Sequence, residues 1–277
     1  MTSRTRRSWT GQRAAQRSSL PSPALFRKPH LSDERHREVN VGAVGHVMEA
    51  AKRHGVRRVI HCSTVGIHGP VNGLPANEES PIVPIGIYER SRPRVRRWRL
   101  NTAVTAVRRW WWCPTQVYGP GDTRLLKLFE LASRRRVVLV GPGTAGYHLL
   151  YIDDLIDAFL LAAEADSASG EAFIIGAPER SNVNDIIKTL GNILDCPDQQ
   201  VIRLPIGPIA LLADGCERVC RPLGIPPPIY RCRIEFFTSN GAHVMGKARR
   251  MLGSRSKVPM VECLRRTVER YPENSLM

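Results

Sequence analysis

The chain has 277 residues, of which 42% are hydrophobic, and its 41 Lys and Arg outnumber its 25 Asp and Glu to give a net charge of +16. This length can hold one large domain or two small ones with a sizeable core. The basic excess lies largely in two stretches, 1–37 and 92–112, and no nucleic-acid-binding module accompanies it. We therefore expect no nucleic-acid partner.

The cysteines and the hydropathy indicate the kind of compartment in which the protein resides. The seven Cys are an odd number without C-x-x-C pairs, which is typical of free thiols in a reducing compartment. Cys216 and Cys220 are four apart, but no His or Cys stands near them at ligand spacing, so no metal site is expected. No apolar run approaches the length of a membrane span, and residues 204–213 are short and interrupted by Pro, so membrane contact is not favoured. We expect a cytoplasmic protein, or a mitochondrial one if the acid-free residues 1–32 are a presequence.

The stretch that begins at Val39 predicts an amphipathic helix followed by a tight turn. Asn40 can cap the helix, apolar residues follow at helical spacing, and Gly55 stands where a left-handed C-cap belongs. A short apolar strand, 56–61, comes next, and two hydroxyl residues follow it. A helix, a turn and a buried strand that ends in polar residues are typical of an α/β sheet, whose ligands bind at the carboxyl ends of the strands.

A family resemblance is carried by these residues. The sequences are V-N-V-G-A-V-G (39–45) and A-A-K-R-H-G-V-R-R-V-I-H-C-S-T-V-G-I-H-G (50–69), and C-P-T-Q-V-Y-G-P-G-D (113–122), Y-I-D-D-L-I-D-A (151–158) and G-E-A-F-I-I-G (170–176) follow. Together they resemble the extended short-chain dehydrogenase/reductases, which include NAD-dependent epimerases and dehydratases and 3β-hydroxysteroid dehydrogenases. The resemblance implies oxidoreductase or epimerase chemistry on a secondary alcohol or ketone, such as a nucleotide sugar or a steroid.

One part of the family pattern has no counterpart. The family's first β-α-β unit, with a G-x-x-G-x-x-G turn that holds the cofactor pyrophosphate, is not found in residues 1–37. We expect an α/β fold with a Rossmann-like doubly wound parallel sheet that lacks this unit, and a small mixed C-terminal lobe. The predicted divisions are a basic, disordered N-terminal segment (1–37), a partial NAD(P)-binding domain (38–180) and a substrate-binding lobe (181–277).

The resemblance also implies catalytic residues. Thr64 matches the family's Ser or Thr that bonds the reacting oxygen, and Tyr88 matches its proton-exchanging Tyr. The family continues Y-x-x-x-K, in which the Lys lies one helical turn beyond the Tyr and lowers its pKa. Here Arg92 takes that place; it keeps the charge but is bulkier and forked. Pro93 follows and biases Arg92 away from helical geometry.

The remaining implications concern the cofactor, NAD or NADP, and the partners. The resemblance implies cofactor contacts for four residues, Asn40, Ser63, Pro114 and Tyr118. A plain helix cap suits Asn40 equally well, and packing suits Pro114 and Tyr118 equally well. A small-molecule substrate is expected, and a homodimer is left open. His68 and His148 border the presumed cleft without an assigned role, and Asp153 matches a residue that organises the fold.

A second glycine motif is a weaker candidate for the cofactor. The run V-V-L-V-G-P-G-T-A-G (137–146) contains G-x-G-x-x-G after a strand-like segment. A helix should open directly after such a loop, but residues 147–152 look extended, and Pro142 lacks the N–H that would hold a phosphate. We predict an ordinary turn that leads to a helix over 154–165.

Residues 92–112, rich in Arg and Trp, fit neither an amphipathic helix nor a core strand. One hypothesis is a local frame disruption of a family-like sequence, and the alternative is an Arg/Trp patch that stacks on nucleic acid. Three interpretations of the whole chain remain. They are an NAD(P)-dependent oxidoreductase or epimerase, a cofactor-free pseudoenzyme or interaction protein that keeps the fold, and a basic nucleic-acid-binding protein.

Overall fold

The centre of the fold is a parallel sheet. The computed structural model describes residues 18–19, 24–26, 31–56, 58–71, 75–92, 108–122, 125–165, 170–220, 222–223, 225, 227–229, 234 and 241–271. The four strands of the sheet lie in the order β1 (Ser18–Ser19), β2 (Arg58–Cys62), β3 (Arg108–Pro114) and β8 (Ala172–Ile175). All three strand pairs are parallel, and Ile60 of β2 lies opposite Trp110 of β3.

Strand β3 corrects one expectation. The end of the Arg/Trp-rich stretch was expected to fit no core strand, yet Arg108–Pro114 lies between β2 and β8. An inner strand bonds its backbone N–H and C=O groups on both sides, and this pairing does not depend on the side-chain pattern. Residues 93–107 lie outside the described part of the chain, so the frame-disruption and Arg/Trp-patch hypotheses stay predictions.

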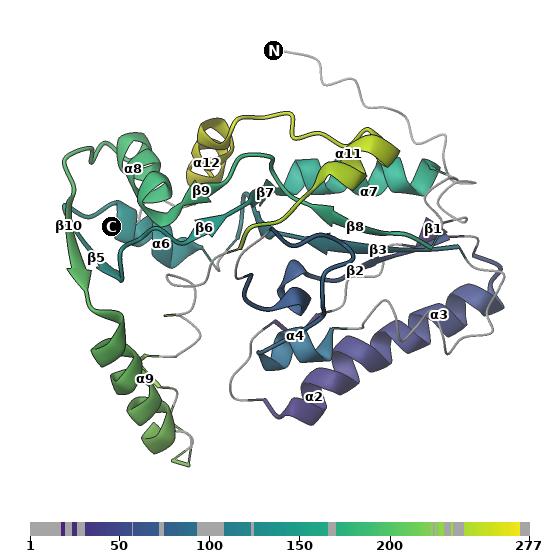
Figure 1. The fold of residues 1–277 in the computed structure, drawn as a ribbon, viewed down its shortest axis with the longest axis horizontal. Coiled ribbons are helices and arrows are strands. Elements are labelled where there is room, and N and C mark those ends of the chain that lie inside the picture. Colours follow the sequence, from purple (N-terminus) through teal and green to yellow (C-terminus); the bar gives the residue numbers. More distant parts are fainter. Residues whose placement is uncertain are drawn as a thin grey trace.

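Helices cover both faces of the sheet (Figure 1). On one face, α7 (Ile152–Glu164) and α11 (Gly246–Leu252) pack onto Ile60 and Phe173. Three helices lie on the other face, namely α2 (Asp33–Arg37), α3 (Ala43–Arg53) and α4 (Ile87–Ser91). This layering is that of a doubly wound sheet, so the predicted α/β fold is confirmed.

The helices α2 and α3 form one helical run. Ser32 caps its start, because its Oγ accepts a hydrogen bond from the backbone N–H of Arg35 at 3.2 Å. A π-helical turn, η1 (Glu38–Gly42), joins α2 to α3 without a break. Asn40 therefore lies inside the run and is not its N-cap, and the run begins within the segment predicted as an N-terminal tail. Gly55, with φ of +64°, follows the end of the run as predicted.

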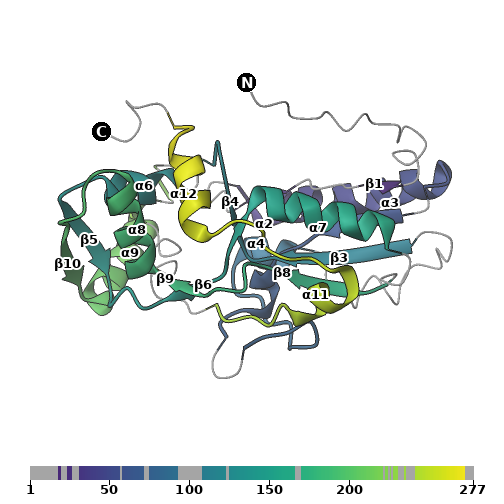
Figure 2. The ribbon, with the colours of Figure 1, turned by 90° about the horizontal axis from the view of Figure 1, so that it is seen from above.

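A second lobe lies at one end of the sheet (Figure 2). Its strands β5 (Arg136–Val140) and β10 (Gln200–Leu204) form a parallel pair. Its helices are α6 (Leu126–Ala132), α8 (Val183–Ile193), α9 (Ile206–Cys220) and α12 (Met260–Val268). Two short strand pairs join the lobes, β4 (Gln116–Tyr118) with β7 (Leu149–Tyr151) and β6 (Gly146–Tyr147) with β9 (Ser181–Asn182). No helix in the described ranges is long and apolar enough to cross a membrane.

Asp154, and not its neighbour Asp153, is the residue that bonds the C-terminal segment to helix α7. Helix α7 begins at Ile152 rather than at 154 and has no side-chain cap. Asp154 is buried, and its carboxylate accepts hydrogen bonds from Ser256 Oγ at 2.7 Å and from the Lys257 backbone N–H at 3.2 Å. Asp154, rather than Asp153, thus organises this part of the fold.

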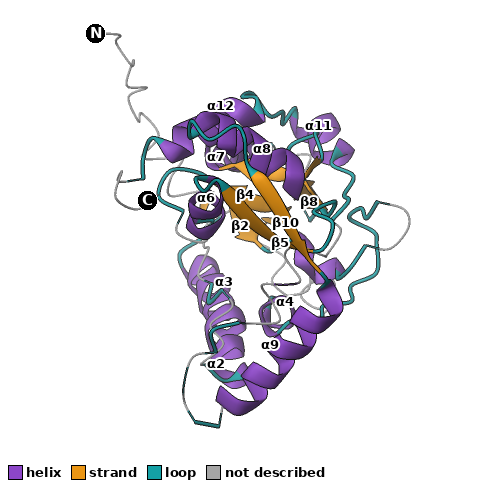
Figure 3. Cartoon of the chain, turned by 90° about the vertical axis from the view of Figure 1, so that its left-hand side faces the viewer, coloured by secondary structure: helices purple, strands orange, loops and turns teal. Residues whose placement is uncertain are grey.

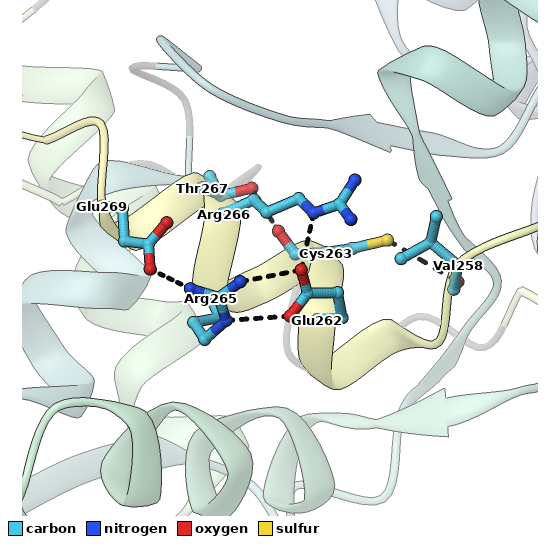
Figure 4. A network of polar contacts seen from close by, with 7 residues as sticks. All are labelled: Val258, Glu262, Cys263, Arg265, Arg266, Thr267 and Glu269. Atoms are coloured by element: carbon cyan, nitrogen blue, oxygen red, sulfur yellow. Dashed lines mark hydrogen bonds and ion pairs between the residues drawn. The ribbon is translucent and has the colours of Figure 1, made fainter. Parts of the chain in front are cut away.

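Helix α12 carries an ion-pair network on its exposed face (Figure 4). The Glu262 carboxylate accepts hydrogen bonds from Arg265 at 2.8 Å and from Arg266 at 2.7 Å, and Arg265 also pairs with Glu269. The bonds from Arg265 and Arg266 lower the pKa of Glu262 to about 2. Because these groups are exposed, solvent screens the network, and the packing of Cys263 in the core matters more to stability.

Candidate active site

The two hydroxyl residues after β2 lie in different surroundings. Thr64 begins the 3₁₀ helix η2 (Val65–His68), and its Oγ1 accepts a hydrogen bond from the Gly66 backbone N–H at 3.2 Å. Ser63 is buried beside the Cys113 thiol. Burial raises the pKa of this thiol to about 12. The strand therefore places Thr64 at the carboxyl edge of the sheet and Ser63 in the core.

Helix α4 packs against η2 through the residue that follows Tyr88. The Glu89 side chain is buried, and a Cβ atom on Gly66 would lie 2.9 Å from its Cγ atom. A Cβ atom on Gly86, the N-cap of α4, would overlap its carboxylate. The two glycines thus let Glu89 fit between these elements, which brings the Thr64 and Tyr88 segments together.

Tyr88 is buried between an arginine and a phenylalanine. The guanidinium carbon of Arg92 lies 5.6 Å from the centroid of the Tyr88 ring, and its Nη2 donates a hydrogen bond to the Cys62 carbonyl. Arg92 has φ of −76° and ψ of 132°, an extended geometry that agrees with the effect predicted for Pro93. The Phe26 ring contacts Tyr88 edge to face at a centroid distance of 4.8 Å. The pair predicted from Y-x-x-x-R is thus brought together.

Asn40 links three segments near Tyr88. Its Oδ1 accepts a hydrogen bond from the Leu25 backbone N–H at 2.7 Å, and its Nδ2 donates to the Leu25 carbonyl at 3.2 Å. Nδ2 also donates to Ser91 Oγ at 2.7 Å, and Ser91 Oγ donates to the Tyr88 carbonyl at 2.8 Å. These bonds hold α4 to the preceding chain, and the cofactor contact implied for Asn40 stays a prediction.

Replacing Asn40 by Ala is expected to destabilise the protein by about 2–3 kcal/mol, because the half-buried backbone groups of Leu25 and the buried Ser91 hydroxyl lose a partner. Urea unfolding measures the change. Asn77→Ala is the matched control. The Asn77 side chain also accepts two hydrogen bonds, from the Glu79 backbone N–H and from Ser80 Oγ, but Asn77 is exposed. Equal losses in the two variants would contradict the role given to Asn40.

Gly69, which ends η2, requires glycine for two reasons. Its φ is +70°, and a Cβ atom would clash with the Val83 carbonyl oxygen. We expect Gly69→Ala to lower the free energy of unfolding by about 3 kcal/mol or more. Gly55→Ala is the control, because its φ is +64° but nothing lies within 4 Å of the added carbon, so about 1 kcal/mol is expected. If both substitutions cost the same, the Val83 contact is unimportant.

Tyr118 lies in the core of the second lobe, and its hydroxyl is at the Cys263 thiol of α12. Burial, chiefly, raises its pKa. Tyr118 also lines a cavity of about 210 Å³ with Tyr151 and Met260. Pro114 ends β3, opposite Ile175 of β8. In Figure 1, α12 and α4 lie on opposite sides of the sheet. The cofactor contacts implied for Pro114 and Tyr118 stay predictions.

The structure brings together three buried histidines, namely His68 and His148, to which the sequence assigned no role, and His243. His68 Nδ1 lies 3.1 Å from the Pro81 carbonyl, and His148 Nδ1 lies 3.0 Å from the Ala177 carbonyl, so both nitrogens carry the proton. The His148 and His243 rings are 6.4 Å apart. Burial, followed by the charges of His148 and His68, lowers the pKa of His243 to about 4. Their separation in sequence hid the cluster, and no metal-binding group occurs among the described residues.

Thr64 and Tyr88 belong to two elements that pack together after β2, and Arg92 lies beside the Tyr88 ring. The catalytic roles implied for these three residues stay predictions. The loop 141–146 leads into β6 and β7 and not into a helix, so it is an ordinary turn, as predicted. Another turn with two glycines, Gly119-Pro120-Gly121, follows β4 and precedes α6, but Pro120 at its centre has no N–H to hold a phosphate.

A profile of the NAD dependent epimerase/dehydratase family matches residues 29–176, which include the whole Thr64–Arg92 site. The chain belongs to this family. As an epimerase/dehydratase family member, it shares its fold with RMD from Pseudomonas aeruginosa, solved with NADPH. The TM-score is 0.71 at 14% identity, with 92% of this chain and 80% of the other covered.

Two curated relatives extend the likeness beyond the profile. The 3beta-hydroxysteroid-dehydrogenase/decarboxylase isoform 1 of Arabidopsis thaliana is 24% identical over 84% of this chain and 57% of its own length. The 2-alkyl-3-oxoalkanoate reductase of Stenotrophomonas maltophilia is 29% identical over 85% of this chain and 74% of its own. This epimerase/dehydratase family member thus spans little more than half of the plant relative.

Proposed function

We propose that this chain catalyses NAD(P)-dependent oxidation, reduction or epimerisation at a secondary alcohol or ketone carbon. The observation that carries the proposal is the placement of Thr64 and Tyr88 on two packed elements at the carboxyl edge of a parallel sheet. The two relatives are named for a hydroxysteroid and for oxoalkanoates, which supports an apolar hydroxy or oxo compound as the substrate class.

The chemistry follows from the side chains of the site. The Tyr88 hydroxyl would give a proton to the substrate oxygen during reduction and take it back during oxidation. Thr64 Oγ1 would hold the same oxygen by a hydrogen bond. Arg92 places a permanent positive charge 5.6 Å from the Tyr88 ring, where the family has its Lys. NAD or NADP, when bound, supplies or accepts the hydride at the substrate carbon.

A second function, a cofactor-free pseudoenzyme or interaction protein, is favoured by one contact. The Phe26 ring packs against Tyr88, and Asn40 holds the neighbouring Leu25 backbone in place. Phe26 therefore covers part of the phenol that a nicotinamide and a substrate would need to reach. The segment that carries Phe26 would have to move before Tyr88 could react.

Titration with NADH and NADPH separates the two functions. Three of the five Trp, at 110–112, lie on β3 in the centre of the sheet, so Trp fluorescence is a suitable signal. Saturable quenching, with turnover of hydroxysteroids or 3-oxoalkanoates, would support the oxidoreductase. A folded protein that binds neither dinucleotide, either as it stands or as Phe26→Ala, would support the pseudoenzyme.

A further inference from the structure

Helix α9 turns its bulky apolar side chains toward solvent. Leu211 is 74% exposed, Leu212 is 60% exposed and Val219 is 63% exposed, whereas the buried residues of the helix are the small Ala210 and Ala213. An ordinary surface helix does the reverse, because it buries its large apolar residues against the core. This helix therefore packs on the protein through small apolar side chains and leaves its larger ones exposed.

Helical spacing gathers the exposed residues into one strip, here called the outward stripe. The outward stripe consists of Pro208, Leu211, Leu212, Gly215 and Val219, all of them exposed. Ala210 and Ala213 pack in the opposite direction, against Val140 and Ile234. The acidic residues of α9, Asp214 and Glu217, each follow a buried Ala by four positions and so lie on the inward side.

The outward stripe lies at an extremity of the molecule. In Figure 1, α9 projects from the β5–β10 sheet away from the rest of the described chain, and in Figure 3 it lies at the lower end of the molecule. The apolar exposure continues beyond the helix at Leu223 and Ile225. Arg218 is exposed and is the charged residue of α9 that borders the stripe. The surface is thus a convex apolar ridge with a cationic edge.

We propose that the outward stripe of α9 docks onto an anionic lipid surface. A convex apolar ridge can enter the interface of a bilayer, which needs no complementary shape. Arg218, at the edge of the outward stripe, can keep its guanidinium among anionic headgroups while its stem lies on the acyl region, and the two acidic residues of α9 lie on the inward side. The apolar residues 204–213 alone did not favour this contact, because composition does not reveal which side chains face outward.

A second copy of the chain is the other candidate occupant. The 15 residues of α9 make a helix about 22 Å long and about 10 Å wide. One face of such a helix falls well short of the roughly 800 Å² that each partner buries in a stable interface. The lipid surface is therefore the occupant that the geometry favours.

Vesicle co-sedimentation of the full chain tests the proposal. We expect the protein to bind phosphatidylcholine vesicles that contain phosphatidylserine and to bind pure phosphatidylcholine more weakly, with salt reducing the difference. The double variant Leu211→Ser, Leu212→Ser should reduce partitioning about tenfold or more. The matched control is Ile156→Ser, Leu160→Ser, because these side chains are about half exposed on α7, on the other side of the molecule. This control should bind as the unaltered chain does.

Three results would overturn the proposal. One is an unaltered chain that does not bind anionic vesicles at low salt, and another is a Leu211, Leu212 variant that binds as strongly as the control. The third is a concentration-dependent dimer that the Leu211, Leu212 variant abolishes, which would make a second copy the occupant. Vesicle binding needs neither cofactor nor turnover, so its outcome is independent of the proposed function.

Discussion

Replacing Tyr88 by Phe is expected to reduce turnover by a factor of roughly 10²–10⁴ and to leave dinucleotide binding unchanged. The substitution removes only the hydroxyl, and the ring keeps its contacts with Phe26 at 4.8 Å and with Arg92 at 5.6 Å. The fold should therefore survive while the proton donor is lost. Steady-state rates and NADPH titration, compared in the same preparation, measure the two effects separately.

Tyr271→Phe is the matched control. The Tyr271 hydroxyl donates a hydrogen bond to the Asp122 carbonyl, and its ring packs on Phe129 in the second lobe. Its removal should lower the thermal midpoint and leave the rate per folded molecule as it was. If Tyr88→Phe retains most of the activity, Tyr88 is not the proton donor, and the proposed mechanism fails.

Acidification from pH 7 to pH 4 is expected to destabilise the protein through buried histidines. Burial, with a smaller effect of Arg92, lowers the pKa of His61 to about 3, and the pKa of His243 is lowered to about 4. In the unfolded chain both rings protonate near 6.5, so that state binds more protons below this pH. The stability that the neutral rings provide is fully present above about pH 6.5. It declines by roughly 1.4 kcal/mol per pH unit and ring as the pH falls toward the folded values.

Thermal midpoints measured from pH 7.5 to pH 4.5 check this expectation. The stability that Glu262 provides through its pKa of about 2 is fully present above its ordinary value of about 4.5 and is lost only below that pH, and the group is exposed. The histidines therefore dominate the chosen window. His61→Asn and His243→Asn should each flatten the pH slope, whatever they do to the midpoint at pH 7.5. His54→Asn, at an exposed position, should not flatten it.

Local features of the structure could be read from the sequence. Gly55 adopts its left-handed conformation because only the end of a helix and a turn are involved. Arg92 leaves the helix because its neighbour is Pro93, and the glycine loop 141–146 leads into strands, in agreement with the extended appearance of residues 147–152. In each case the cause lies within a few residues of the effect. The sequence also placed Thr64 after a strand and Tyr88 on a helix, as the structure has them, while their catalytic roles stay predictions.

Long-range contacts could not be read in this way. Asn40 resembles a helix cap in sequence, but its partners are Leu25 and Ser91, the latter 51 positions away. The histidine cluster joins residues from three distant segments, and the strand Arg108–Pro114 was missed because backbone pairing with both neighbours replaces a β-type side-chain pattern. Ser63 and Thr64 are adjacent in sequence, and only packing decides that one of them is buried.

The π-helical turn Glu38–Gly42 has a consequence for how this helical run tolerates change. His36, Asn40 and Val44 are all fully buried and follow one another at intervals of four, an interval that drifts around an α-helix of 3.6 residues per turn. The wider π turn accommodates the extra residue, so that the three side chains lie on the same face of the helical run. The turn thus sets the rotational phase between α2 and α3. Loss of a single residue within it would rotate one helix against the other and turn a whole buried face outward, whereas a substitution alters one contact.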